Sequence, residues 1–172
     1  MHPARKLLEW LPEYDFAVFG HGFADHGRDY LVVIQDALGG DPGTHRLTFT
    51  HCVRADCESR VMDTVWPKSW TDEFTDYDRW LKAGEPEGYV WGTKWSNAYP
   101  GLELKEESPI AAEWKKKIGR DFFEITLETD RFFLRLVFHD VRFEKLSDAT
   151  DVISKTIIPI GTPPSIDETE KG

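Results

Sequence analysis

The chain has 172 residues, 40% of them hydrophobic and 13% aromatic, and a formal net charge of −10. A chain of this size suits one globular domain that buries a core without disulfides or structural metal, and we expect such a domain over residues 1–160. Residues 161–172, mostly polar and with two consecutive prolines, predict a flexible tail. The negative charge would repel a phosphate backbone, which disfavours nucleic-acid binding as a main function.

The first 16 residues carry basic side chains, but acidic residues and prolines interrupt the apolar positions, so no signal peptide is expected. No other segment is apolar for long enough to span a bilayer, and we expect a cytoplasmic protein that does not bind membranes. Cys52 and Cys57 would face opposite sides of a regular strand. Both are therefore interpreted as reduced, partly buried residues that share neither a disulfide nor a metal.

The first half of the chain indicates a β-meander. Pro3 and the leucines that follow it predict a short N-terminal helix. Residues 14–19 and 30–34 have the alternating or continuous apolar pattern of two hairpin strands, joined by a polar, glycine-rich loop at 20–29. A third strand is predicted at 46–53.

The middle of the chain changes to helical spacing. Thr71 as an N-cap and a break at Gly84 predict a helix near residues 72–82. A strand is expected over 88–95, a turn over 97–101 and a short strand over 102–104. A second helix should begin at Ser108-Pro109 and end at Gly119, with Ala111, Trp114 and Ile118 on its apolar side.

Residues 122–146 form the clearest folding signal, a β-hairpin in which apolar and polar residues alternate. The alternation changes phase at His139-Asp140, which predicts a β-bulge there. The Val152–Ile158 segment could add an edge strand. The elements together predict an α+β fold with a mainly antiparallel β-sheet or sandwich and two or three short helices.

The glycine-rich loop is one candidate site. His21, Asp25 and His26 are residue types that bind metals or transfer protons, although their spacing matches no metal signature. Solvated turn residues are the alternative interpretation. His51 and His139 lie in predicted strands and could approach the same sheet face. The alternative is that each histidine is satisfied structurally by a neighbouring backbone group or by Asp140. Asp140 is a further candidate because bulges often redirect side chains near sites.

A second candidate surface lies in the middle of the chain. Tyr89, Trp91 and Trp95 share one strand face, where they would form a binding surface or pack under the preceding helix. Acidic residues dominate the neighbouring stretch from 72 to 87 and would attract a basic partner. The acidic candidates are Asp72, Asp76 and Asp78.

The familiar catalytic motifs are missing. The sequence has no Gly-x-Ser-x-Gly elbow, no phosphate-binding glycine-rich loop, no His-Glu-x-x-His and no dinucleotide fingerprint. We therefore lean towards a non-enzymatic protein, and expect no cofactor and no metal.

Three segments resemble the uncharacterised bacterial YxiG-like domain family: Leu47–Val53, Asp78–Leu81 running into Gly88–Gly92, and Val137–Val141. The resemblance covers most of residues 14–146 and implies no catalytic residues. Small bacterial domains of this kind also resemble toxin-neutralising immunity proteins. Our leading hypothesis is a domain that binds a basic protein partner, such as an immunity-type toxin inhibitor. The alternative is a small-molecule or carbohydrate binder, or a hydrolase, that uses the His21/His26 loop or the Trp91/Trp95 face.

Overall fold

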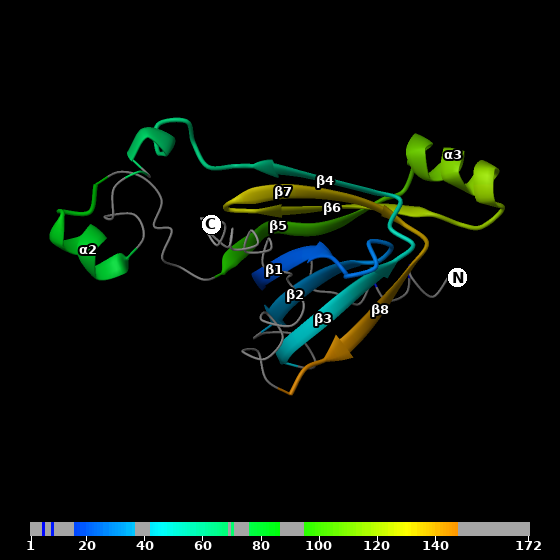
Figure 1. The fold of residues 1–172 in the computed structure, drawn as a ribbon, viewed down its shortest axis with the longest axis horizontal. Helices are drawn as coiled ribbons and strands as arrows, with labels where there is room; N and C mark the ends of the chain where they lie inside the picture. Colours follow the sequence, from blue (N-terminus) through cyan, green and yellow to red (C-terminus); the bar gives the residue numbers. More distant parts are fainter. Residues whose placement is uncertain are drawn as a thin grey trace, which may run out of the picture.

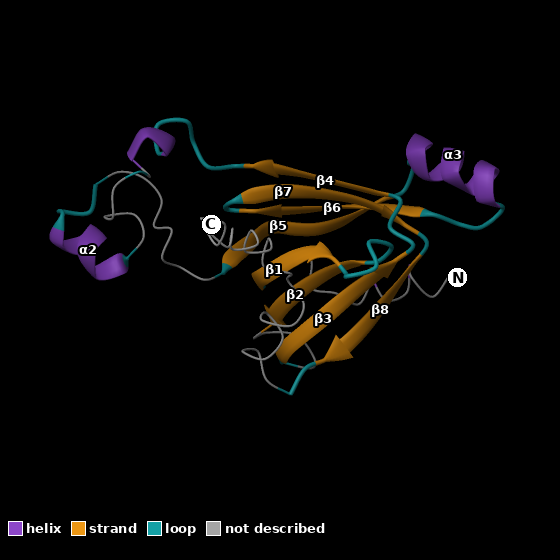
Figure 2. Cartoon of the chain, in the orientation of Figure 1, coloured by secondary structure: helices purple, strands orange, loops and turns teal. Residues whose placement is uncertain are grey.

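The computed structural model describes Arg5, Leu8 and residues 16–36, 42–68, 70, 76–86 and 95–147. Figures 1 and 2 show a strongly bent β-sheet with one helix beside it and a second helix set apart from it. In chain order the elements are β1 (Ala17–Phe23), β2 (Tyr30–Asp36), β3 (Gly43–Thr50), β4 (Arg54–Ser59), the 3-10 helix η1 (Trp66–Lys68), α2 (Tyr77–Lys82), β5 (Ser96–Lys105), α3 (Pro109–Ile118), β6 (Phe123–Thr129), β7 (Phe132–Phe138) and β8 (Asp140–Lys145).

The sheet has eight strands in the order β4-β7-β6-β5-β1-β2-β3-β8, and every pairing is antiparallel. Strands β4, β7, β6 and β5 form one half of the sheet, and β1, β2, β3 and β8 form the other. A short pairing of Ala17 and Val18 with Asn97 and Ser96 joins the halves between β1 and β5. The predicted α+β fold with a mainly antiparallel sheet is confirmed.

The two halves pack their apolar faces against each other. Phe49 of β3 meets Phe138 of β7 edge to face, with ring centroids 4.8 Å apart. Leu127 of β6 and Leu134 of β7 are directly opposite in the ladder and fully buried. The alternation that predicts the β6–β7 hairpin thus arises because one face of it fills this core.

The other face of the hairpin is covered in part by α3. Val137 is fully buried in a small cluster with Ala111 and Phe122, and Trp114 packs against it. Helix α3 begins as predicted, because the Ser108 side chain accepts a hydrogen bond from the Ala111 N–H at 3.0 Å. It ends as predicted at Gly119, which has a φ of 75° that favours glycine. The apolar side is only partly covered, since Ile118 is 50% exposed.

Helix α2 is shorter than the predicted helix at 72–82. Its N-cap is Asp76, whose extended backbone precedes the helix and whose side chain accepts from the Arg79 N–H at 3.0 Å. The predicted N-cap Thr71 lies outside the described residues, whereas the extended Asp76 shows that no single helix runs from 72 to 82. None of the residues of α2 is buried.

The predicted turn at 97–101 is part of a strand. Strand β5 runs without a break from Ser96 to Lys105, and its pairing with β6 shifts register between Ala98 and Gly101. Gly101 has a φ of 103°, a conformation that permits such an irregularity within a ladder. A Pro-Gly pair does not distinguish a turn from a bulge in the sequence, because both structures favour these residues.

The loop between β1 and β2 is shorter than predicted. Strand β1 extends to Phe23, so His21 lies in a strand rather than in the loop. Arg5 and Leu8 are helical, in line with the N-terminal helix, and Leu8 is buried. The predicted strands at 88–94 and 152–158 and the tail at 161–172 lie outside the described residues. No helix in the described ranges is long and apolar enough to cross a membrane.

Candidate functional site

The sheet bends sharply where the chain passes from one half to the other, and we call this bend the corner (Figure 1). The chain passes from β3 to β4 through His51–Val53, and from β7 to β8 through His139. Thr50 pairs with Asp140 on one side of the corner, and Arg54 pairs with Val137 on the other. Between these two pairs one segment has three residues, 51–53, and the facing segment has two, 138 and 139. The β3–β4 connection therefore contains one extra residue.

This arrangement corrects the predicted bulge at His139-Asp140. The extra residue belongs to the facing segment, His51–Val53, and the phase change at His139 reflects a change of partner strand from β6 and β4 to β3. The His139 N–H donates to the Thr50 carbonyl at 3.0 Å, and the Val53 N–H donates to the Val137 carbonyl at 2.8 Å. The two segments thus remain hydrogen-bonded through the bend.

His51 adopts an unusual backbone conformation at this corner, with a φ of 50°. A residue other than glycine is uncommon in this left-handed region and needs support from its surroundings. Asp29 supplies it, since its Oδ1 atom accepts a hydrogen bond from the His51 N–H at 3.0 Å. The Cys52 N–H also donates to the Arg28 carbonyl at 2.8 Å, so the β1–β2 loop holds the corner in place.

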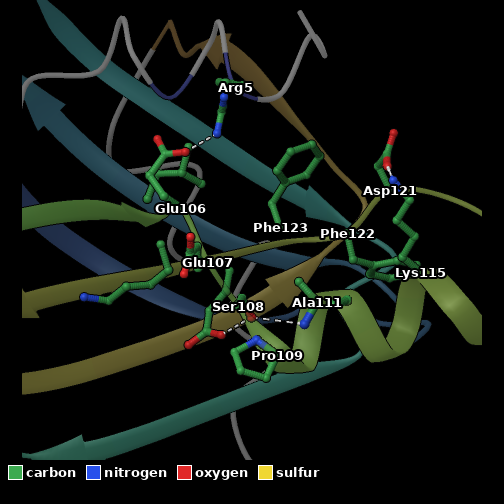
Figure 3. A pocket seen from close by; sticks show the side chains of 14 residues that line it. Arg5, Glu106, Glu107, Ser108, Pro109, Ala111, Lys115, Asp121, Phe122 and Phe123 are labelled. Atoms are coloured by element: carbon green, nitrogen blue, oxygen red, sulfur yellow. Dashed lines mark hydrogen bonds and ion pairs between the residues drawn. The ribbon is translucent and has the colours of Figure 1, made fainter.

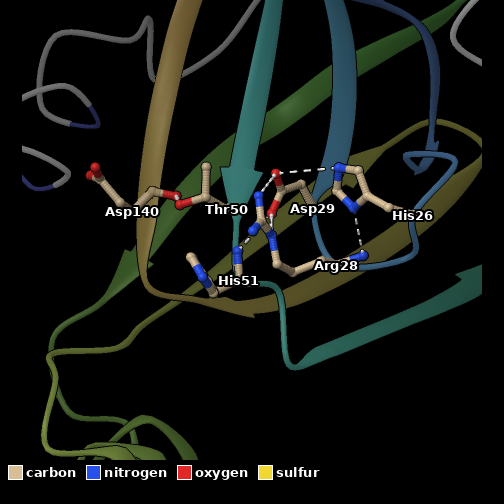
Figure 4. A network of polar contacts seen from close by, with 6 residues as sticks. All are labelled: His26, Arg28, Asp29, Thr50, His51 and Asp140. Atoms are coloured by element: carbon tan, nitrogen blue, oxygen red, sulfur yellow. Dashed lines mark hydrogen bonds and ion pairs between the residues drawn. The ribbon is translucent and has the colours of Figure 1, made fainter.

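Asp29 is the centre of a polar network (Figure 4). Its carboxylate accepts from Arg28 Nε at 2.9 Å and from Arg28 Nη2 at 3.0 Å, and His26 Nε2 lies 3.7 Å from Asp29 Oδ2. The Arg28 hydrogen bond and the His51 N–H hold the pKa of the Asp29 carboxyl below its usual range, although burial opposes them. The network therefore contains a buried carboxylate that is charged at neutral pH.

A cavity of about 410 Å³ opens beside the corner. Two histidines and two arginines line it together with a thiol and three apolar side chains; the lining residues are Arg28, His51, Cys52, Val53, Ile118, Arg120, Phe122 and His139. The His51 and His139 rings meet edge to face with centroids 5.9 Å apart, and the His139 and Phe122 rings are also 5.9 Å apart. His51 and His139 do approach each other, but the predicted placement of both in strands was wrong, because they lie in the connections β3–β4 and β7–β8.

The thiol in this cavity is not prepared for nucleophilic chemistry. Burial raises the pKa of Cys52 to about 11, and its Sγ donates a hydrogen bond to the Arg54 carbonyl at 3.1 Å. A reactive cysteine needs a lowered pKa, because the thiolate is the nucleophile. Cys52 therefore lacks the lowered pKa that is typical of a nucleophilic cysteine.

A second cavity, of about 520 Å³, lies on the other side of Phe122, between α3 and the neighbouring strands (Figure 3). Several of its charged side chains are already paired with one another or with nearby groups. Arg5 pairs with Glu106, Lys115 pairs with Asp121 at 2.7 Å, and Ser108 is hydrogen-bonded to Glu124. In these contacts positive and negative side chains of the cavity already bind each other. Fewer charged groups are therefore left to bind a charged ligand here than at the corner.

The three candidate residues of the predicted glycine-rich loop lie in different environments. His21 is partly buried in β1, where its Nδ1 is hydrogen-bonded to the Tyr30 hydroxyl at 2.7 Å and its ring lies 4.4 Å from the Phe132 ring. Burial lowers the pKa of His21, as expected for a core histidine. Asp25 and His26 lie on the exposed loop instead. Among the described residues, no three His, Cys, Asp or Glu side chains are placed to hold a metal.

The remaining predicted residues fall in different places. Asp140 starts β8 and lies apart from the Asp29 network in Figure 4, and its buried Oδ1 has no hydrogen-bond partner among the described residues. Asp76 and Asp78 are exposed at the start of α2. Trp95 precedes β5, is 43% exposed and lies 6.2 Å from the Phe19 ring. Asp72, Tyr89 and Trp91 lie outside the described residues.

Sequence reasoning missed Arg28, Arg120 and Phe122 as residues of one cavity. They come from the β1–β2 loop and from the segment between α3 and β6. Arg120 follows Gly119, which the sequence marks as the end of a helix, Phe122 begins the predicted hairpin, and Arg28 lies in the predicted polar loop at 20–29. Their proximity, however, depends on a strand order that a single sequence does not specify.

Large apolar side chains are exposed on the segment between β4 and β5, which we call the β4–β5 excursion (the described residues 60–68, 70 and 76–86). Figure 1 shows it extending away from the sheet, with α2 at its far end. Trp70 is 89% exposed and Tyr77 is 60% exposed. Met62, Trp66 and Leu81 are exposed as well.

Comparison with known proteins places the chain in a family. The model of the YxiG-like protein family matches residues 3–154. The chain belongs to the YxiG-like protein family. A comparison with curated proteins finds no match. Among solved structures, the chain is similar to an uncharacterized protein from Neisseria gonorrhoeae, with a TM-score of 0.35, 12% sequence identity, and coverage of 77% of this chain and 93% of that one.

Proposed function

We propose that this YxiG-like chain binds a basic protein partner through the β4–β5 excursion, as an immunity-type inhibitor of a basic toxin would. The observation that carries the proposal is the exposure of large apolar side chains on a segment that extends away from the sheet. Contiguous apolar side chains at a protein surface often mark a protein interface, and aromatic residues are enriched in interfaces.

Helix α2 supplies the clearest apolar anchors of this surface. Tyr77 and Leu81 are one helical turn apart, so they lie on the same face, and neither is buried. The Tyr77 ring lies 5.6 Å from the Trp80 ring, and the Trp80 indole N–H donates to the Pro86 carbonyl at 2.9 Å. These contacts hold the aromatic side chains in place before a partner binds, which reduces the entropy lost on binding.

Charge supports a basic partner. The whole chain has a formal net charge of −10. Between residues 72 and 87 six acidic residues stand against two basic ones, and the described acids Asp76 and Asp78 flank Tyr77. An acidic rim around apolar anchors would accelerate association with a cationic protein and discriminate against acidic ones.

The test begins with tagged full-length chain as bait in a lysate of the native host at low and at moderate salt. The expected partner is a basic protein, which is then purified and titrated against the chain. Combined substitution of Tyr77→Ala and Leu81→Ala should weaken binding about tenfold or more, because anchor residues carry most of the affinity. The matched control is Tyr99→Ala, since Tyr99 is 75% exposed but lies in β5.

Two results would count against the proposal. One is the absence of any specific protein partner at either salt concentration. The other is a partner whose affinity is reduced as much by Tyr99→Ala as by the α2 substitutions. A gene for a toxin beside the gene for this chain would support the immunity-type role in particular.

A further inference from the structure

We propose that the corner cavity is a binding site for a small organic anion, an aromatic or short aliphatic group that carries one carboxylate or phosphate. The cavity lies at the corner of the sheet, at the opposite end of the molecule from α2 in Figure 1. It is therefore a site distinct from the proposed protein-binding surface. Its volume of about 410 Å³ lies within the range of small-molecule sites.

The sign of charge around the cavity is the first argument. Four of its eight lining residues carry cationic or protonatable side chains: Arg28, His51, Arg120 and His139. None of the described residues that line the cavity is acidic. Three acids are adjacent in sequence to lining residues: Asp29 binds Arg28, Asp121 binds Lys115, and Asp140 starts β8 after His139. Two guanidinium groups at one cavity, on a chain with ten excess negative charges, attract anions locally even though Asp29 balances part of the Arg28 charge.

The arginines supply donors suited to an anion. Arg28 uses Nε and Nη2 to bind Asp29, which fixes its guanidinium at the cavity. A guanidinium has five N–H donors in a planar fork, so this ion pair leaves further donors for a second acceptor. Arg120 is exposed and follows the end of α3, so its side chain can reach an incoming carboxylate or phosphate without breaking the fold.

The histidines and apolar side chains indicate what the uncharged part of the ligand would be. His139 Nδ1 lies 2.6 Å from the Asp121 carbonyl, which accepts only, so Nδ1 carries the proton in this contact. This bond fixes the ring that lies between His51 and Phe122. Val53, Ile118 and Phe122 supply apolar surface beside the two imidazole rings. A ligand with a ring or short alkyl group would bury it here while its anionic end meets the arginines.

Backbone amide NMR spectra of the full chain test this proposal with three probes. Benzoate and phenyl phosphate present the two kinds of anionic group, and benzamide is a neutral analogue of benzoate. We expect both anions, or the one with the preferred head group, to shift the amides of Val53, Phe122 and His139 with a Kd below about 10 mM. Benzamide should bind at least about tenfold more weakly, because it cannot form charge-assisted hydrogen bonds.

Matched variants locate the binding. Arg120→Gln should weaken binding of the preferred anion about tenfold, whereas Lys116→Gln should leave it within about twofold. Lys116 is an exposed cation in the last turn of the same helix and does not line the cavity. His51→Asn should also weaken binding, since asparagine tolerates the positive φ of this position while removing the ring.

The proposal is overturned if neither anion shifts these amides, if benzamide binds as tightly as the anions, or if Arg120→Gln and Lys116→Gln have equal effects. The ranking of benzoate and phenyl phosphate decides which head group the site prefers. None of these outcomes depends on whether the β4–β5 excursion binds a protein.

Discussion

The Asp29 carboxylate accepts a hydrogen bond from the His51 N–H at 3.0 Å and so joins the β1–β2 loop to the corner between β3 and β4. The same carboxylate binds the Arg28 guanidinium through two hydrogen bonds. One buried acid thus stabilises an uncommon backbone conformation at His51 and positions an arginine at the edge of the corner cavity. The geometry of the cavity depends on this contact.

Asp29→Ala should lower the free energy of unfolding by about 1–3 kcal/mol, because it removes the acceptor of a buried N–H and the partner of Arg28. Urea denaturation at neutral pH measures the change. Asp25→Ala is the matched control, since Asp25 lies in the same loop and is exposed. A loss of stability no larger than that of the control would show that the corner is held by other contacts.

The alternation of apolar residues was enough to predict the β6–β7 hairpin, because one face of it fills the core between the two halves of the sheet. The limits of helix α3 were also predictable, since Ser108 and Gly119 make local contacts that their residue types favour. Both predictions rest on interactions within a short segment. The position and type of these two elements can therefore be predicted from the residues within them.

The corner could not be predicted in the same way. The pairings of β3 with β8 and of β4 with β7 join residues more than 70 positions apart, and nothing in either segment specifies the other. The phase change at His139 signals an irregularity but not which strand carries the extra residue. The alternating pattern suggests that His51 and His139 could approach each other, but it places both in strands, whereas they lie in connections between strands. Arg28 and Arg120 also lie in connections, whose position depends on the whole sheet.

His21 should make the stability of the protein depend on pH. Burial lowers the pKa of His21, so the folded protein leaves it neutral at a pH where the unfolded chain protonates it. The unfolded state then binds more protons, and the stability that is present above about pH 6.5 is lost as the pH falls. The contribution of this group is at most about 1.4 kcal/mol per pH unit.

A comparison of wild type and His21→Phe isolates this contribution, because phenylalanine keeps an aromatic ring against Phe132 but does not titrate. Unfolding free energies measured between about pH 5 and pH 8 should fall less steeply towards acid in the variant. Parallel profiles for wild type and His21→Phe would contradict this assignment.

Phe138 should be among the most sensitive positions of the core. It is fully buried, meets Phe49 edge to face, and ends the strand that leads into the corner. Phe138→Ala should lower the free energy of unfolding by about 3–5 kcal/mol, since it removes apolar contacts and leaves a cavity. Phe23→Ala is the control, because Phe23 is 42% exposed. Similar losses in both variants would mean that the halves of the sheet do not share one core.

The two cysteines should differ in their reaction with iodoacetamide. The thiol of Cys52 has a pKa raised to about 11 by burial, so only about one molecule in ten thousand is a thiolate at pH 7. Burial also raises the pKa of Cys57, but its side chain is exposed. Mass spectrometry of the native protein should therefore find Cys57 modified first, and Cys57→Ser should remove this rapid labelling. Rapid modification of Cys52 in the folded protein would mean instead that the corner opens readily, and with it the proposed anion site.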